Sequence, residues 1–173
     1  MRTFISLNIP PDIKRQIMRV QENLPKFMGK IIEPENLHLT LKFLGDIREE
    51  KLALVEDILR KIKFKEFEMT IDSLGIFSSG NPRIVWLGSS GSSLLQEKID
   101  ESLFPLFAKE QRFMEHLTIA RLKSVKNKRE FLQKLKDIKI HRMEFHVKEF
   151  YLEESVLLSK GPRYKVLGRY PLV

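Results

Sequence analysis

The sequence contains 173 residues, of which 42% are hydrophobic, and its 31 Lys and Arg against 23 Asp and Glu give a formal net charge of +8. It has no Cys, which excludes disulfides and thiolate metal sites, and no run of about 18 apolar residues that would predict a membrane span. A chain of this length can bury a hydrophobic core without cross-links. We therefore expect a soluble, cytoplasmic, monomeric protein.

The basic excess favours a polyanionic partner, with RNA or DNA first. Another explanation of the same composition stays open. Proteins of thermophiles are also rich in Lys and Glu and poor in Asn, Gln and Cys, and this chain has 5 Asn and 5 Gln.

Alternation and helical periodicity predict the elements of the first half. Residues 3–9 read as a strand, and Pro10-Pro11-Asp12 then opens a helix whose apolar face ends before Pro25. The segment "HLTLKFLG" over 38–45 predicts a second strand, and apolar residues over 52–62 recur at helical spacing. "FEMTIDSLGIF" over 67–77 predicts a third strand, and "SSGNPR" over 78–83 is typical of a turn.

The second half predicts the same order of elements. A strand over 83–87 leads into the loop "GSSGSS", whose last serines can cap a helix with Leu95, Ile99 and Leu103 on one face. "HLTIARL" over 116–122 predicts a strand, and a short basic helix follows near 131–135. The last segments are a long strand, or a strand with a bend, over 143–158, a turn over 159–164 and a closing strand over 164–173.

The order strand, helix, strand beginning with His-x-Thr, helix, strand thus occurs twice. His38 and His116 begin matching tetrapeptides, and a Phe follows each of them after the same number of residues, at 67 and at 145. This organisation predicts an α+β fold with two lobes related by an approximate two-fold axis. We expect two antiparallel sheets flanked by helices around a central cleft, in a single two-lobed domain spanning 1–173.

Each His-x-Thr segment places two polar side chains on one face of its strand. Because side chains alternate along a strand, His38 and Thr40 point one way and the Leu residues between and after them point the other. The same holds for His116 and Thr118. If the lobes are related by a two-fold axis, these polar faces meet across the cleft, and two imidazoles with two hydroxyls surround one site.

That arrangement suits phosphoryl chemistry. An in-line displacement at phosphorus needs a base on the attacking side and an acid on the leaving side, and imidazole, with an ordinary pKa of about 6.5, serves in both roles. The hydroxyls of Thr40 and Thr118 can donate to the non-bridging oxygens. By strand parity Lys42 shares the face of Thr40 and would add positive charge near the phosphate.

Other uses of these residues are less well supported by the sequence. The spacings of zinc ligands, a G-x-S-x-G nucleophile, a Walker A loop and a Rossmann glycine pattern are all absent. His141 lies in a basic turn and His146 in a strand, and we expect neither to be catalytic. The structural alternative is that each His caps or packs at a strand edge and that each Thr is present for its β-propensity.

The two segments resemble the paired motifs of the two-histidine phosphoesterases of LigT type, a family that includes the RNA 2',3'-cyclic phosphodiesterases, also called 2'-5' RNA ligases. The resemblance rests on "HLTLKFLG" and "HLTIAR" and extends to "MRTFISLNIPPDIK", "RIVWLG" and "ESVLLSKGPRYKVLGRYPL", so it covers nearly the whole chain.

The resemblance implies metal-independent hydrolysis of 2',3'-cyclic phosphate ends of RNA, tRNA fragments among them, to 2'-phosphomonoesters, without a cofactor. It implies that His38 donates a proton to the leaving oxygen and that His116 accepts one from water. Thr40 and Thr118 would hold the phosphate, and Arg121 matches an Arg of the family. The reverse reaction, 2'-5' ligation, follows from microscopic reversibility.

Two residues bear on that expectation. Strand parity puts Arg121 opposite the face of His116, so a β-bulge or the strand end has to redirect it. Glu115 stands where the family often has Pro. The alternative from another functional class is a basic RNA-binding protein that keeps the fold without turnover.

Overall fold

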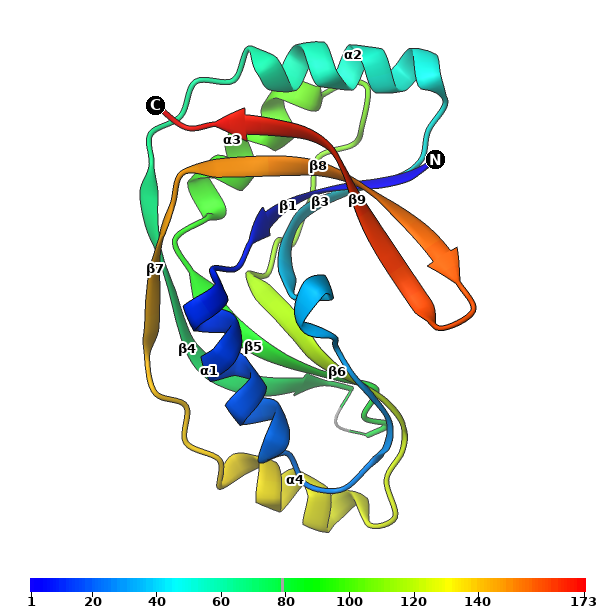
Figure 1. The fold of residues 1–173 in the computed structure, drawn as a ribbon, viewed down its shortest axis with the longest axis vertical. Helices are drawn as coiled ribbons and strands as arrows, with labels where there is room; N and C mark the ends of the chain where they lie inside the picture. The colour runs from blue at the N-terminus through cyan, green and yellow to red at the C-terminus, as the bar shows by residue number, and fades with distance from the viewer. Residues whose placement is uncertain (79) are drawn as a thin grey trace.

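Two antiparallel β-sheets form the framework of the protein (Figure 1). The computed structural model describes residues 1–78 and 80–173, so Ser79, within the predicted turn, lies outside the described residues. One sheet has the strand order β3-β1-β8-β9 and the other the order β2-β6-β5-β4-β7. The strands are β1 (Arg2–Asn8), β2 (Met28–Ile31), β3 (His38–Asp46), β4 (Phe67–Phe77), β5 (Ile84–Ser90), β6 (His116–Ser124), β7 (Met143–Val147), β8 (Glu149–Leu158) and β9 (Gly161–Pro171).

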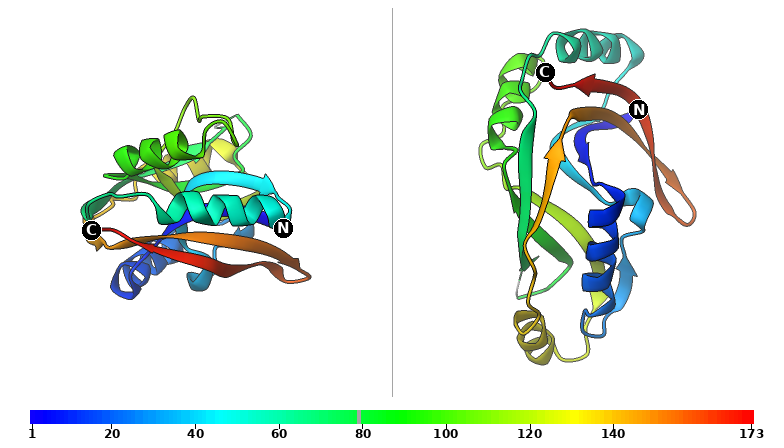
Figure 2. Two further views of the ribbon diagram at one scale, coloured as in Figure 1. Left: turned by 90° about the horizontal axis from the view of Figure 1, so that it is seen from above. Right: turned by 60° about the vertical axis from the view of Figure 1, so that its left-hand side comes forward.

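All four predicted helices are present, and two of them, α2 and α4, lie at opposite ends of the molecule (Figure 2). The helices are α1 (Pro11–Glu22), α2 (Glu49–Arg60), α3 (Ser93–Leu103) and α4 (Lys128–Lys136). Pro11 occupies the first turn of α1, where the missing N–H removes no hydrogen bond. The sequence analysis missed β2 and the 3₁₀ helix Pro34–Asn36, because both are too short to show a period.

Each sheet is covered by a helix that follows a strand of the other sheet. Helix α1 follows β1 of the four-stranded sheet but contacts β6 and β7 of the five-stranded sheet. Helix α3 follows β5 of the five-stranded sheet but contacts β3. Residues from both sheets and all four helices therefore join one continuous hydrophobic core, and the two lobes interlock.

The segment over 143–158 bends and changes sheets. Strand β7 pairs with β4 in the five-stranded sheet, and after Lys148 the chain continues as β8, which pairs with β1 in the other sheet. In the β4–β7 register, Phe67 lies opposite Val147 and Met69 opposite Phe145. Phe67 is equivalent to Phe145 in the other half and Met69 to Val147, so exchanging the halves turns one of these pairs into the other, as a two-fold axis requires. The predicted pseudo-symmetric α+β fold is confirmed.

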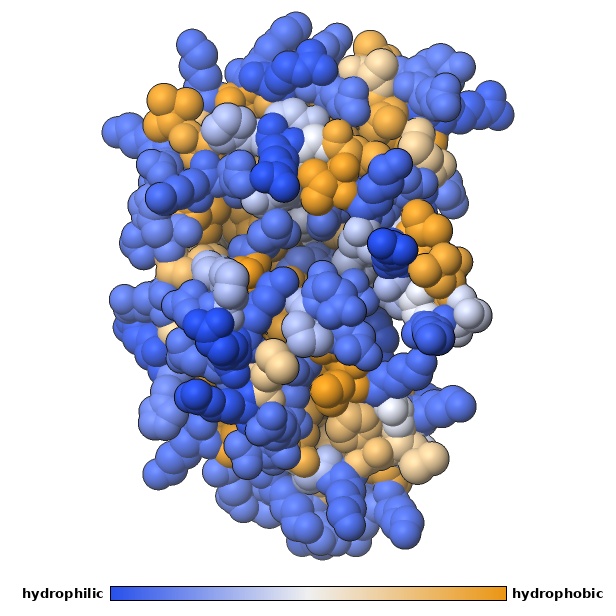
Figure 3. All heavy atoms as spheres, in the orientation of Figure 1, coloured by the Kyte–Doolittle hydropathy of each residue, from blue (hydrophilic) through white to orange (hydrophobic). Residues whose placement is uncertain are grey.

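The outer surface is mostly polar, as Figure 3 shows for one face. Apolar residues gather there over the tip of the β8–β9 hairpin, where Val156, Leu157 and Leu158 are exposed. Among the described helices, none is long and apolar enough to cross a membrane.

Strand β3 contains a β-bulge just after its His-x-Thr segment. In the register with β1, Thr40 lies opposite Ser6 and Lys42 lies opposite Ile5, so Leu41 is an extra residue. A bulge shifts the alternation of side chains by one position. The alternation of side chains between the two faces of β3 is therefore reversed after Leu41.

Strand β6 contains a bulge at the equivalent position. Thr118 lies opposite Trp86 and Ala120 opposite Val85, so Ile119 is the extra residue. The sequence of buried and exposed positions along β6 is the same as along β3. The two motif strands therefore share a local backbone irregularity as well as a tetrapeptide.

The prediction that Lys42 shares the face of Thr40 is wrong, because the bulge turns Lys42 into the interior. Its side chain is only 1% exposed. The Nζ atom donates to Asp100 Oδ1 at 2.5 Å and to the carbonyl of Ala108 at 2.8 Å. Asp100 also accepts the backbone N–H of Glu110 at 2.7 Å through Oδ2. Lys42 thus connects β3 to α3 and to the loop after it.

We expect Asp100→Ala to lower the free energy of unfolding by about 3–5 kcal/mol, since removing one partner of a buried ion pair leaves the other charge uncompensated. Urea unfolding followed by circular dichroism measures the effect. The double variant Lys42→Met/Asp100→Leu should recover much of the loss, because it removes both charges together.

The matched control is Asp57→Ala, which breaks the exposed Arg60–Asp57 pair on α2. Its effect should stay below about 1 kcal/mol. Equal losses for Asp57→Ala and Asp100→Ala would show that the buried pair is not a special stabilising element.

Candidate functional site

The two His-x-Thr segments come from different sheets and lie close to each other. Pairs of Cα atoms from β3 and β6 approach within 8 Å. The charge of His116 acts on the pKa of His38, lowering it. The structure therefore brings together the two motifs that the sequence places 78 residues apart.

Each motif histidine is oriented by a backbone carbonyl two residues before it. His38 Nδ1 lies 2.7 Å from the carbonyl oxygen of Asn36, and His116 Nδ1 lies 2.9 Å from that of Met114. A carbonyl oxygen only accepts, so Nδ1 carries the proton in both rings. In the neutral ring Nε2 is then left as an acceptor.

His38 Nε2 is also joined to the threonine of its own motif, at 3.0 Å from Thr40 Oγ1. Because the neutral ring accepts at Nε2, the hydroxyl of Thr40 donates. This bond ties the orientation of Thr40 to the protonation state of His38.

Aromatic rings surround both histidines. The rings of Phe4 and Tyr164 lie 5.0 Å and 4.9 Å from that of His38, measured between centroids. Phe77 lies 5.1 Å from His116 in an edge-on arrangement, and Trp86 lies 6.5 Å away. The rings beside His38 reduce its contact with water, which strengthens electrostatic effects on that imidazole.

Burial lowers the pKa of His38 to about 4, and the positive charges of Arg121, Lys14 and His116 act in the same direction. The hydrogen bond to Asn36 opposes this shift. The imidazole of His38 is therefore neutral near pH 7 in the free protein, and the cations around it attract an anion.

The bulge at Ile119 redirects Arg121, as the sequence analysis required. Arg121 is exposed, whereas its neighbours Ala120 and Leu122 are buried. Its charge lowers the pKa of His38 and opposes the rise that burial causes in the pKa of Tyr164. Arg121 therefore lies on the side of the motif histidines.

Comparison with known proteins identifies the family. The model of the LigT like phosphoesterase family matches residues 7–86 and 92–164. The chain belongs to this family. A relative in Methanocaldococcus jannaschii, named RNA 2',3'-cyclic phosphodiesterase, is 35% identical over 177 residues, covering 98% of this chain and 100% of that protein.

Solved structures agree with the assignment to the LigT like phosphoesterases. A crystal structure of a Thermus thermophilus protein has a TM-score of 0.83 and 25% identity, covering 99% of this chain and 97% of that one. Escherichia coli LigT in complex with 3'-AMP has a TM-score of 0.79 and 26% identity, with 99% and 97% covered.

Several residues beside the motifs in this LigT like phosphoesterase were not predicted from the sequence. Lys14 of α1 acts on the pKa values of both His38 and Glu153. Glu153 is buried and accepts a hydrogen bond from Ser6 Oγ at 2.7 Å, and burial raises its pKa. No sequence signal marks these side chains, because they come from α1, β1 and β8 and meet only in the folded chain.

The other two histidines belong to neither motif. His141 is exposed, and His146 on β7 is paired with Glu68 and with Glu66, the latter at 3.3 Å. The hydrogen bond with Glu68 raises the pKa of His146. The described part of the chain contains no cluster of three or more His, Cys, Asp or Glu side chains suited to a metal ion.

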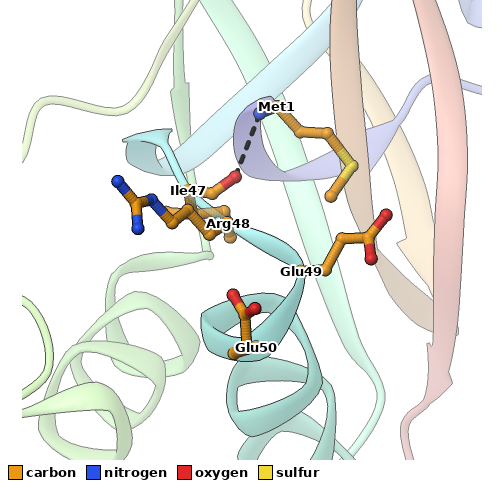
Figure 4. Close-up of a pocket in the computed structure, with 5 residues that line it drawn as sticks. All are labelled: Met1, Ile47, Arg48, Glu49 and Glu50. Carbon is orange, nitrogen blue, oxygen red and sulfur yellow. Dashed lines mark hydrogen bonds between the residues drawn. The ribbon is translucent and has the colours of Figure 1, made fainter.

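A surface hollow of about 400 Å³ is lined by Met1 and residues 47–50, and Met1 donates its N-terminal amine to the carbonyl of Ile47 at 3.0 Å (Figure 4). It contains neither motif. Another hollow, of about 540 Å³, adjoins the second motif and is lined in part by Trp86, Gly88 and Glu115.

The lowered pKa of His38 predicts how stability depends on pH. Its ordinary value is 6.5 and its folded value about 4, so between these pH values the unfolded chain binds more protons than the folded one. The contribution of His38 to the free energy of unfolding is fully present above pH 6.5. It falls by about 3 kcal/mol as the pH decreases toward 4. Urea unfolding at several pH values should show this loss in the wild-type protein and a shallower decline in His38→Asn.

An NMR titration of the imidazole ¹³Cε1 signal checks the assignment directly, since His38 should titrate about two units below a solvated histidine. If the wild-type protein and His38→Asn lose stability in parallel, the low pKa of His38 is refuted.

Proposed function

We propose that this protein hydrolyses the 2',3'-cyclic phosphate ends of RNA to 2'-phosphomonoesters. The observation that carries the proposal is the meeting of two His-x-Thr motifs from opposite sheets, each with its imidazole Nε2 left as an acceptor by a carbonyl on Nδ1. The relative named RNA 2',3'-cyclic phosphodiesterase supports the choice of substrate.

In the proposed reaction, water attacks phosphorus in line with the 3' oxygen. His116 Nε2 takes a proton from the water as the new P–O bond forms. The bond from phosphorus to the 3' oxygen breaks, and His38 Nε2 gives that oxygen a proton. The products are a 2'-phosphomonoester and a free 3' hydroxyl. Thr40, Thr118 and Arg121 hold the non-bridging oxygens, where negative charge collects.

Substrate binding makes His38 an acid. With a pKa of about 4 in the free protein, His38 is neutral until the phosphate anion arrives. An anion beside an imidazole favours its charged form. Protonated Nε2 can no longer accept from Thr40, so the hydroxyl of Thr40 is free to turn toward the phosphate.

Ligation, which is the reverse of the cleavage of a 2'-5' bond, uses the same groups. A 5' hydroxyl in the place of water gives a 2'-5' linkage, and the strain of the cyclic phosphate supplies the driving force without a nucleotide cofactor. A binding protein without turnover is not favoured, because both motifs are complete and oriented.

We further propose that residues 1–173 act as one two-lobed unit, since a single core runs through both lobes. RNA ends such as those of tRNA fragments are the substrates that the sequence led us to expect. The monomeric state and the cytoplasmic location expected from the sequence remain predictions.

The decisive experiment is incubation with an oligonucleotide that ends in a 2',3'-cyclic phosphate. Hydrolysis should continue in EDTA and leave the phosphate on the 2' oxygen. His38→Ala and His116→Ala should each lower the rate by about 10²-fold or more, because each removes a proton-transfer group.

His141→Ala is the matched control, because this histidine is exposed and belongs to neither motif. Its rate should equal that of the wild-type protein. Retention of most activity by either motif variant, with folding intact, would refute the roles proposed for the two histidines.

Phe43 is proposed to stack on a base of the RNA. It is 68% exposed on β3, and its ring lies 6.3 Å from that of Phe4, which in turn lies against His38. Phe43→Ala should raise KM for a dinucleotide cyclic phosphate about tenfold with little change in kcat, since stacking on an aromatic ring contributes about 1–3 kcal/mol per base.

Steady-state kinetics measure the split between KM and kcat. Phe43→Tyr keeps the ring and should bind as the wild-type protein does. A KM unchanged in Phe43→Ala would rule out the stacking role.

A further inference from the structure

Glu115, the residue directly before the second motif, caps the start of α3 with its side chain. Its Oε1 accepts the backbone N–H of Ser92 at 3.0 Å. Helix α3 has no cap of its own, because the side chain of Ser92 makes no capping hydrogen bond and the first turn contains no acidic residue. A carboxylate at a helix N-terminus satisfies a free N–H and interacts favourably with the helix dipole. The cap of α3 is therefore supplied from the start of β6.

The backbone of Glu115 is anchored beside its side chain. Its carbonyl oxygen accepts the N–H of Ser89, near the end of β5, at 3.2 Å. Burial raises the pKa of Glu115, and hydrogen bonds from Ser93 and Ser92 oppose this rise. The side chain and the main chain thus fix Glu115 to both ends of the short connection between β5 and α3.

The two neighbours of Glu115 in the sequence are the partners of the hydrogen bond that orients the second histidine. The carbonyl of Met114 lies 2.9 Å from His116 Nδ1. Met114 belongs to a segment, 108–115, that contains neither helix nor strand. Regular secondary structure therefore does not fix the direction of its carbonyl, and the two anchors of Glu115 supply the constraint.

The first motif is held in another way. Asn36, whose carbonyl orients His38, ends the 3₁₀ helix Pro34–Asn36, and its N–H donates to the carbonyl of Glu33 at 2.9 Å. Its side chain also donates to the carbonyl of Pro162 at 3.1 Å. A local turn thus fixes the carbonyl behind His38. The equivalent described segment before β6 contains no such helix, so the second motif depends on a more distant anchor.

We propose that Glu115 is a positioning residue for the base: it fixes the carbonyl of Met114 and, through it, the tautomer and the direction of the His116 ring. This role rests on the proposed function, in which His116 Nε2 takes a proton from water. A neutral ring that carries its proton on Nε2 has no acceptor there. Without the cap, a fraction of the molecules would therefore hold an inactive base, although the ring and the phosphate contacts are still present.

The ¹⁵N NMR signals of the neutral His116 ring report its tautomer directly. In the wild-type protein the proton should be on Nδ1. Glu115→Asp keeps the charge but is too short to reach the N–H of Ser92, so it should shift His116 toward the Nε2–H form. Glu115→Gln keeps an acceptor of the same reach and should keep the wild-type signal. The measurement needs no turnover, so its result is independent of whether the cyclic phosphate is hydrolysed.

Steady-state kinetics test the consequence for the reaction. With an oligonucleotide that ends in a 2',3'-cyclic phosphate, Glu115→Asp should lower kcat about tenfold or more with little change in KM, because misplacing a catalytic group costs rate rather than binding. Glu115→Gln should keep most of the wild-type kcat, since the cap needs the acceptor and not the charge.

Asn127→Ala is the matched control. Asn127 Oδ1 caps α4 by accepting the N–H of Glu130 at 3.0 Å, and the residue belongs to neither motif. Losing this cap should also reduce stability, but kcat and the tautomer of His116 should equal those of the wild-type protein. A lower kcat in Asn127→Ala would show that a lost helix cap acts through stability alone, which overturns the proposal.

Other results would also contradict the role of Glu115. These are an unchanged tautomer or an unchanged kcat in Glu115→Asp, and a loss in Glu115→Gln as large as that in Glu115→Asp, which would make the charge the important property. If the wild-type protein hydrolyses no cyclic phosphate but Glu115→Asp shifts the tautomer, the proposed function fails while the positioning of His116 by Glu115 is supported.

Discussion

One extra residue in each motif strand fixes the layout of the site. Leu41 in β3 and Ile119 in β6 are bulged, and each reverses the alternation of its strand immediately after the threonine. Before the bulge, the His and Thr of each motif share the partly exposed face of the strand. After it, Arg121 is exposed and Lys42 is buried, which is the opposite of what uninterrupted alternation along each strand predicts.

The electrostatics of the site follow from this arrangement. Lys14 and Arg121 come from different elements, yet both act on His38, which burial already holds in its neutral form. A site of this kind is poorly suited to a cation and well suited to a phosphate anion. The anion compensates the positive charges and, by favouring the imidazolium, produces the acid that the reaction needs.

The departures from two-fold symmetry make the two sides of the cleft chemically different. Phe43 occupies the position equivalent to Arg121, so one wall offers an exposed ring and the other a charge. The hollow with Trp86 and Glu115 lies on the side of His116. An approximately symmetric pair of motifs thus faces surroundings that differ, which suits a substrate whose leaving and attacking oxygens belong to different groups.

The sequence determined the four helices, the long strands, the repeated order and the four motif residues, because local periodicity and a doubled tetrapeptide are properties of the chain itself. It did not determine the faces of Lys42 and Arg121, since a bulge depends on pairing with a neighbouring strand and leaves no period to read. Nor did it reveal Lys14, Ser6 and Glu153, because these side chains come from separate elements. Only the packing of the two sheets and α1 decides which of them meet.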